Sequence, residues 1–280
     1  MRISKATLAA GAGRWAQRPE WLLGFLAAAA LLLLVYALNL TVAEPRAASP
    51  WGLTYGTLAT LLLAGAGSLA ARRRTFRSGL GRTQTWVQLH VYGGTLFALL
   101  VLMHAGFEWP RSGLNRWLMG LSLWVAASGL AGVAVRKWLP RVLASALTTE
   151  VLYERIPELA AVLRRRAEEL VAAAPGPVRD LYRRSLAPLL AAPRFRWIYF
   201  ADVTGGIANR LRELDYLAGR LPAEGRGVLD ELRSVVRTKL ELDAHYTLQR
   251  PLRWWLYAHV PPSLVLLLLV AVHLLAVWYF

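Results

Sequence analysis

The stretch WWLYAHVPPSLVLLLLVAVHLLAVWYF, Trp254 to Phe280, decides the fold of this chain. Its 27 residues carry no formal charge apart from what two histidines, His259 and His273, hold. A helix needs about 20 mainly apolar residues to cross the hydrocarbon core of a bilayer. We therefore expect a transmembrane helix with two ionisable side chains inside it.

A second apolar run, Thr83 to Phe107, also holds two histidines, His90 and His104. In both runs the two histidines lie 14 positions apart. Fourteen residues of helix rise about 21 Å, and 14 steps of about 100° end about 40° short of four full turns. Each helix is therefore expected to present two imidazoles on one face, one in each leaflet.

The composition places the chain among polytopic membrane proteins. Of its 280 residues, 56% are hydrophobic, and the mean hydropathy is +0.38. The sequence has no cysteine, which excludes a covalently attached c-type haem, a cysteine-ligated iron–sulfur cluster, disulfides and a thiolate catalyst. The net charge of +16 suits the positive-inside bias of membrane proteins, so no nucleic-acid partner is expected.

Five apolar runs predict an all-α fold, a polytopic membrane bundle of five transmembrane helices. The first run has 23 uncharged residues, more than the core of a usual secretory signal, so we expect a retained anchor helix. A charged segment separates the fourth and fifth runs and predicts a helical cytoplasmic insertion. The predicted domains are 1–137 with helices at about 21–43, 47–71, 83–107 and 117–135, a cytoplasmic helical domain at 138–252, and the fifth helix within 253–280.

Apolar residues recur at helical spacing within the charged segment, and the alternating charges predict solvated helices with one packed face. Pro251 is expected to interrupt the chain before the fifth membrane helix, and Pro261 and Pro262 are expected to kink that helix below its midpoint. The four helical patterns cover about 157–174, 178–190, 206–221 and 223–249.

The flanking Lys and Arg residues predict the orientation. Eleven of them lie on the side of the N-terminus and three on the other side, so the first side is expected to be cytoplasmic. The third and fifth helices then run parallel, which puts His90 and His259 in the inner leaflet and His104 and His273 in the outer one. We expect a bacterial-type inner membrane protein with its N-terminus and the 138–252 domain in the cytoplasm and its C-terminus outside.

Four histidines matched in depth on two parallel helices predict metal ligation by His90, His104, His259 and His273. A facing imidazole pair inside a membrane suits a haem iron with two axial histidines. Two other interpretations remain open. The histidines could form a proton relay in a transporter or channel, or they could be structural hydrogen-bonding residues in a membrane anchor.

This pattern resembles the haem-binding helices of cytochrome b of the bc-type complexes, and it is similar to the membrane domains of ferric reductases and NADPH oxidases. The resemblance covers the third to fifth helices and rests on the four membrane histidines. It implies two stacked, non-covalent haem b groups, each with two histidine ligands, and transmembrane electron transfer. The inner haem would be held by His90 and His259, and the outer haem by His104 and His273.

Several other residues are expected to support these groups. Gly93 and Gly94 lie between the histidines of the third helix, where they would let a flat macrocycle approach the backbone; small residues for helix packing are an equally good explanation. His245 lies 14 positions before His259 but is expected to be an ordinary histidine of the charged domain. The arginines that could pair with haem propionates are Arg77, Arg82 and Arg253 on the inner side and Arg111 and Arg116 on the outer side.

An iron with both axial positions filled has no site for a substrate, so we expect an electron-transfer subunit of an oxidoreductase complex and not a catalyst by itself. It would connect a quinone pool or a redox partner on one face of the membrane to a partner on the other. The chain has no cysteine for clusters of its own, so the expected neighbour is a multihaem c-type cytochrome or an iron–sulfur protein. The expected surroundings are membrane lipid.

Overall fold

The computed structural model describes residues 19–42, 46–75, 82–146, 151–219 and 226–279. All regular structure in these ranges is helical, which confirms the all-α class. The chain divides into two compact units. The first comprises Met1–Ala134 with Trp255–Phe280, and the second comprises Val135–Trp254.

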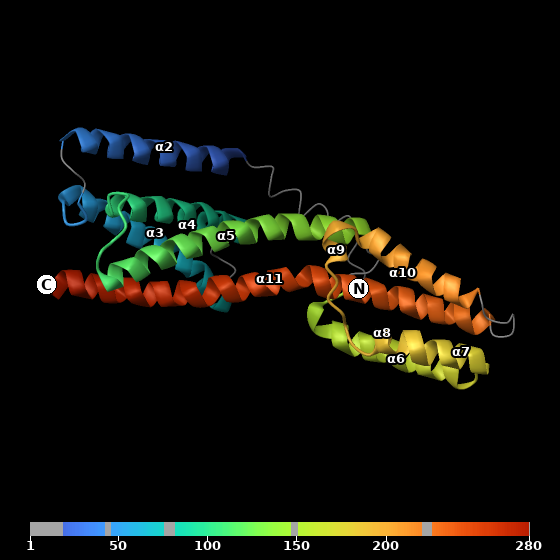
Figure 1. The fold of residues 1–280 in the computed structure, drawn as a ribbon. Helices are drawn as coiled ribbons and strands as arrows, with labels where there is room; N and C mark the ends of the chain where they lie inside the picture. The colour runs from blue at the N-terminus through green and yellow to red at the C-terminus, as the bar shows by residue number, and fades with distance from the viewer. Residues whose placement is uncertain (1–18, 43–45, 76–81, 147–150, 220–225, 280) are drawn as a thin grey trace. The chain divides into compact units, whose positions relative to one another are not determined.

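Five helices in the described part of the chain are long and apolar enough to cross a membrane, which is the pattern of a multi-pass membrane protein. Each coincides with one of the five predicted apolar runs, so the predicted number of spans is confirmed. They are α2 (Pro19–Val42), α3 (Pro50–Thr75), α4 (Thr83–His104), α5 (Gly113–Ala146) and α11 (Arg226–Tyr279) (Figure 1).

The helices of the first unit pack around a small apolar core. Tyr55 of α3, Leu100 and Met103 of α4, and Leu266 of α11 are almost fully buried in it. Figure 1 shows α3, α4 and α5 lying alongside the C-terminal part of α11. Many other large apolar side chains on these helices, such as Leu31, face outward. Outward apolar side chains of this kind suit contact with lipid tails. The helices can lie in lipid because their backbone polar groups are hydrogen-bonded within each helix.

Two helices extend beyond their apolar runs. Helix α5 continues past Arg136 and Lys137, and α11 continues through Pro251 as well as Pro261 and Pro262. The interruption expected at Pro251 is therefore wrong. A proline removes one backbone hydrogen bond, at a cost of about 3 kcal/mol, and the flanking turn is held by Leu248, which is fully buried in the core of the second unit.

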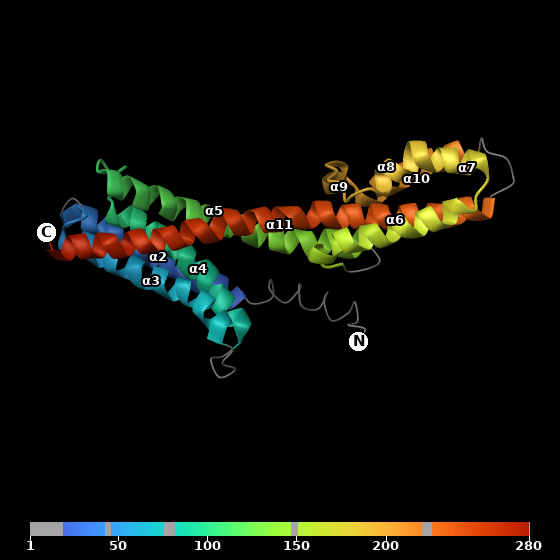
Figure 2. The ribbon, with the colours of Figure 1, turned by 90° about the horizontal axis from the view of Figure 1, so that it is seen from below.

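The second unit is a helical domain, as its apolar periodicity predicts. Pro157 lies in the first turn of its first long helix, a position that needs no backbone N–H donor. Helices α6 and α10 pack against the N-terminal part of α11 through a shared apolar core (Figure 2). Its further elements are η2 (Tyr153–Arg155), α6 (Ile156–Ala172), α7 (Gly176–Leu181), η3 (Tyr182–Leu186, a π-helical turn), α8 (Ala187–Leu190), α9 (Ile198–Ala201) and α10 (Val203–Ala218).

Candidate functional site

The four membrane histidines form two facing pairs. The ring centroids of His90 and His259 are 6.1 Å apart with an interplanar angle of 81°, and those of His104 and His273 are 6.5 Å apart at 79°. In each pair one ring comes from α4 and the other from α11. The structure thus brings together the histidines whose expected depths match, and this arrangement requires α4 and α11 to run in the same direction.

The separation within each pair matches two imidazoles that share one metal ion. An imidazole nitrogen lies about 2 Å from a metal that it ligates and about 1.1 Å from the centre of its own ring, so two rings bound in line have centroids about 6.2 Å apart. The observed separations of 6.1 Å and 6.5 Å lie close to this value. The distance between the ring centres is therefore compatible with a shared metal ion in both pairs.

Helix α3 orients both histidines of α4. The Nδ1 atom of His90 is 3.0 Å from the carbonyl oxygen of Ala66, and the Nδ1 atom of His104 is 2.8 Å from the carbonyl oxygen of Gly52. A carbonyl oxygen only accepts, so Nδ1 carries the proton in both rings and Nε2 keeps its lone pair. A histidine that ligates a metal commonly has its other ring nitrogen fixed in this way.

Helix α5 orients His259 from the other side. The Oγ atom of Ser128 donates to the carbonyl of Val125 and lies 2.9 Å from Nδ1 of His259, so it can accept a hydrogen bond from the Nδ1–H group. Trp255 stacks on the His259 ring at a centroid distance of 5.6 Å, and its indole N–H donates to the carbonyl of Ser128. The His259 ring is therefore held on its Nδ1 side by α5 and on one face by Trp255.

Glycines make room for these rings. A methyl group added at Gly56 would lie 2.9 Å from Nδ1 of His104, and one added at Gly129 would lie 3.3 Å from Cε1 of His259. At Gly93 and Gly94 an added methyl group would meet no atom of the described chain within 4 Å. Close helix packing therefore does not explain Gly93 and Gly94 among the described residues.

An apolar layer separates the two pairs. Phe97 of α4 and Leu266 of α11 each lie seven positions from both histidines of their own helix, a rise of about 10 Å in either direction. Both side chains are buried in the same core. The two histidine pairs are therefore stacked along the helices with apolar side chains between them.

The structure does not bring the proposed propionate partners to the histidines. Arg82 and Arg116 are exposed at the beginnings of α4 and α5, and in the described residues no hydrogen bond or ion pair joins them to a membrane histidine. Arg253 instead pairs with Glu154 at 3.1 Å and lies over the ring of Tyr153, within the second unit. Arg111 is exposed, and Arg77 lies outside the described residues.

The histidine pairs supply two ligands each, which limits the kinds of metal group that they could hold. No group of three or more His, Asp or Glu side chains that could hold a metal ion occurs in the described ranges. A protein site for a bare zinc ion needs three or four such ligands, whereas the macrocycle supplies the equatorial nitrogens of haem iron and leaves only axial positions to the protein. Paired histidines therefore fit haem.

His245 lies in the second unit, 3.3 Å from the side-chain amide of Gln249, as an ordinary buried histidine.

Sequence reasoning missed four residues that contact the histidines. They are Ser128, Trp255, and Ala66 and Gly52, whose carbonyls accept from His90 and His104. Ser128 had a signal, because it is a polar residue inside an apolar run. Trp255 lies at the end of an apolar run, where tryptophans are common at a membrane interface, and a backbone carbonyl has no residue type to detect. Comparison of the chain with known proteins found no matching family model, no matching curated protein and no matching solved structure.

Proposed function

We propose that this chain is a membrane b-type cytochrome that carries electrons across the bilayer through two haems. His90 and His259 would hold one haem, and His104 and His273 the other. The observation that carries the proposal is the pair of ring separations, 6.1 Å and 6.5 Å, between histidines of two helices. When bound, haem with two axial imidazoles supplies one-electron transfer and leaves no open position for a substrate.

The chain's own residues prepare this site before any cofactor enters. Hydrogen bonds from Nδ1 fix the tautomer of His90, His104 and His259, so each presents an Nε2 lone pair. Gly93 and Gly94 lie on α4 between its two histidines, where the lack of a side chain favours close approach of a flat ring. Phe97 and Leu266 keep water out of the layer between the pairs.

The wider setting follows from the charges in the flanks of the spans. The excess of Lys and Arg supports a cytoplasmic N-terminus and a cytoplasmic second unit in a bacterial-type inner membrane. In this orientation His90 and His259 serve the inner leaflet. The protein would then pass electrons between a quinone pool or redox partner on one face and a multihaem c-type cytochrome or iron–sulfur protein on the other, as a subunit of a larger complex.

The test is the haem content of the purified full chain, measured as the pyridine haemochrome and by the reduced-minus-oxidised spectrum. We expect two haem b per chain. His90→Ala and His259→Ala should each remove the same haem, and His104→Ala and His273→Ala should each remove the other. His245→Ala is the matched control, because this fifth histidine lies in the second unit, and it should keep both haems.

A colourless protein from cells with ample haem would contradict the proposal. Proton flux in vesicles that depends on the four histidines would then favour a relay. Unchanged assembly after replacement of all four, without flux, would favour a membrane anchor with structural histidines.

A further inference from the structure

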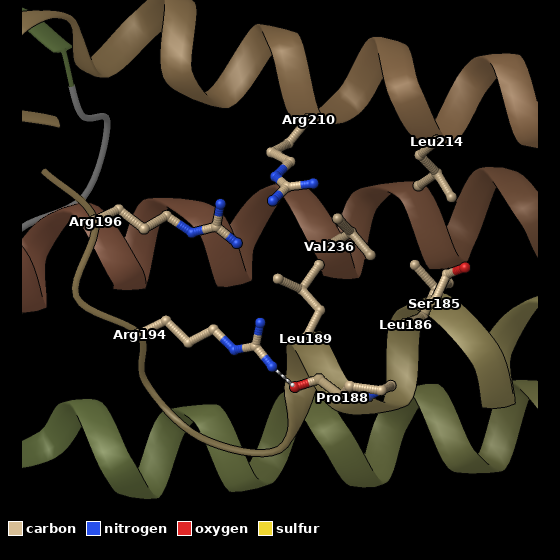
Figure 3. A pocket seen from close by; sticks show the side chains of 9 residues that line it. All are labelled: Ser185, Leu186, Pro188, Leu189, Arg194, Arg196, Arg210, Leu214 and Val236. Carbon is tan, nitrogen blue, oxygen red and sulfur yellow. Dashed lines mark hydrogen bonds between the residues drawn. The ribbon is translucent and has the colours of Figure 1, made fainter. Parts of the chain in front are cut away.

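Three arginines line a cavity in the second unit, and none of the four membrane histidines belongs to it. Its volume is about 140 Å³, and its walls include Arg194, Arg196 and Arg210 together with apolar side chains such as Leu189 and Val236 (Figure 3). A cavity needs only about 10–15 Å³ to hold one water molecule. This one therefore has room for a small anion and several waters, but not for a whole nucleotide.

Hydrogen bonds to α11 fix the segment that carries two of the arginines. The backbone N–H of Arg194 donates to Oδ1 of Asp243 at 2.8 Å, and the backbone N–H of Arg196 donates to Oγ1 of Thr247 at 3.1 Å. The segment is non-helical here, and residues two apart in an extended chain point to the same side. Both arginine side chains are therefore directed to one region, as Figure 3 shows.

The guanidinium groups gather positive charge at this cavity. Figure 3 shows the side chains of Arg196 and Arg210 reaching toward one another, with Arg194 on the same side and bonded to the carbonyl of Pro188. Asp243 binds Lys239 at 2.7 Å in a fully buried pair, so its charge is already balanced. Arg194 and Arg210 are exposed and Arg196 is half-buried, so water screens part of the repulsion between these like charges, and an anion bound between them would lower it further.

One residue that lines the cavity carries a buried donor without a partner. Nε of Arg196 is buried and has no hydrogen-bond partner in the described part of the chain. A buried donor of this kind costs free energy until an acceptor reaches it. Burial also raises the pKa of the neighbouring Tyr199 to about 12, and Arg196 and Arg210 offset part of that rise.

We infer that this cavity binds a phosphate group. Arginine matches the oxygens of phosphate through paired N–H donors and stays charged at any physiological pH. Three guanidinium groups suit the three terminal oxygens of a phosphate monoester better than the two oxygens of a carboxylate. The phosphate can belong to a small soluble compound or to the headgroup of an acidic phospholipid such as phosphatidic acid.

The experiment measures thermal unfolding of the full chain by circular dichroism, with two probes. In neutral detergent, inorganic phosphate replaces chloride at constant ionic strength and below about 1 mM, where the general stabilising effect of excluded salts does not act. In nanodiscs, phosphatidylcholine alone is compared with phosphatidylcholine containing phosphatidic acid. Binding should raise the unfolding temperature in a saturable way.

Arg196→Gln and Arg210→Gln should weaken the response about tenfold or more in apparent affinity, because each removes hydrogen bonds to a charged group. Arg179→Gln is the matched control, since it removes the same charge from an exposed position outside the cavity. The unfolding temperature of each variant without probe shows whether that variant folds. If a variant fails to fold, the response of the wild-type chain still tests the inference.

A response to inorganic phosphate that the cavity variants lose identifies a soluble phosphate compound as the ligand class. A response to phosphatidic acid alone, lost in the same variants, identifies a lipid headgroup. The inference is overturned if the wild-type chain responds to neither probe, or if the response survives in both Arg196→Gln and Arg210→Gln.

Discussion

Single oxygen atoms on neighbouring helices orient the histidines of the candidate site. For His90 and His104 the acceptor is a backbone carbonyl of α3, and for His259 it is the hydroxyl of Ser128 on α5. A carbonyl cannot be removed by substitution, but a hydroxyl can. The role of these bonds can therefore be tested at Ser128.

Ser128→Ala should weaken haem binding at the His90 and His259 pair. The substitution removes one acceptor of the His259 Nδ1–H and leaves the carbonyl of Val125. Loss of an outer hydrogen-bond partner commonly costs about 10–100-fold in metal affinity, so we expect a loss of about tenfold here. Haem titration of the apoprotein measures the effect. Ser68→Ala is the matched control, because Oγ of Ser68 bonds only to its own helix at Gly65 among the described contacts. Equal affinities in the two variants would contradict the role given to Ser128.

Gly56→Ala should remove the haem of the His104 and His273 pair and leave the other. The new methyl group would lie 2.9 Å from Nδ1 of His104, closer than ordinary contact allows, so the ring must turn away. The pyridine haemochrome should fall from two haems per chain to one. Gly65→Ala on the same helix is the control, since its methyl group would meet nothing within 4 Å, and it should keep both.

Helix α11 combines two different environments along one element. Its C-terminal part carries His259 and His273 within the first unit, and its N-terminal part carries Lys239 and Asp243 in the core of the second. The two charged residues lie one helical turn apart, and both side chains are fully buried. Inside a protein, such a pair is costly to break and much less costly to replace as a whole.

Lys239→Met should destabilise the chain by about 3–5 kcal/mol, because it leaves the carboxylate of Asp243 buried without its cation. The double variant Lys239→Met with Asp243→Leu should lose less than Lys239→Met alone. Chemical unfolding followed by circular dichroism measures both. Arg164→Met breaks an exposed pair of the same spacing with Glu168 and should change stability little. A double variant less stable than Lys239→Met would show that the pair itself stabilises the fold.

At the scale of the whole molecule, the arrangement depends on how the chain crosses the membrane. If all five candidate spans cross the membrane, the connection after α4 and the second unit are expected on opposite sides of it. From the asymmetry of Lys and Arg we expect the second unit in the cytoplasm under the positive-inside rule. The absence of cysteine from the sequence makes this assignment simple to test, because any introduced thiol is unique.

Ser112→Cys and Ala173→Cys should react with a membrane-impermeant thiol reagent from opposite sides. Both residues are exposed, one between α4 and α5 and one after α6. In right-side-out vesicles Ser112→Cys should label at once and Ala173→Cys only after lysis, while inverted vesicles should reverse the order. Labelling of both from the same side would contradict the five-span topology.

Local patterns along the chain were enough to predict the helical class, the five spans and the helices of the second unit. They failed at Pro251, where packing of the neighbouring turns in the core outweighs the proline's cost and α11 continues. They also missed Trp255, since an interfacial tryptophan and one that stacks on His259 look the same in sequence.

The sequence by itself determined which residues can cross a membrane and which face of each helix its histidines share, because hydropathy and helical periodicity are properties of neighbouring residues. Only the tertiary structure decided the ring separations, the oxygen that orients each imidazole, and the gathering of three arginines around one cavity. Those features join residues far apart in the chain. Their geometry depends on how closely the helices pack, and that packing requires residues without a side chain, such as Gly56 beside His104.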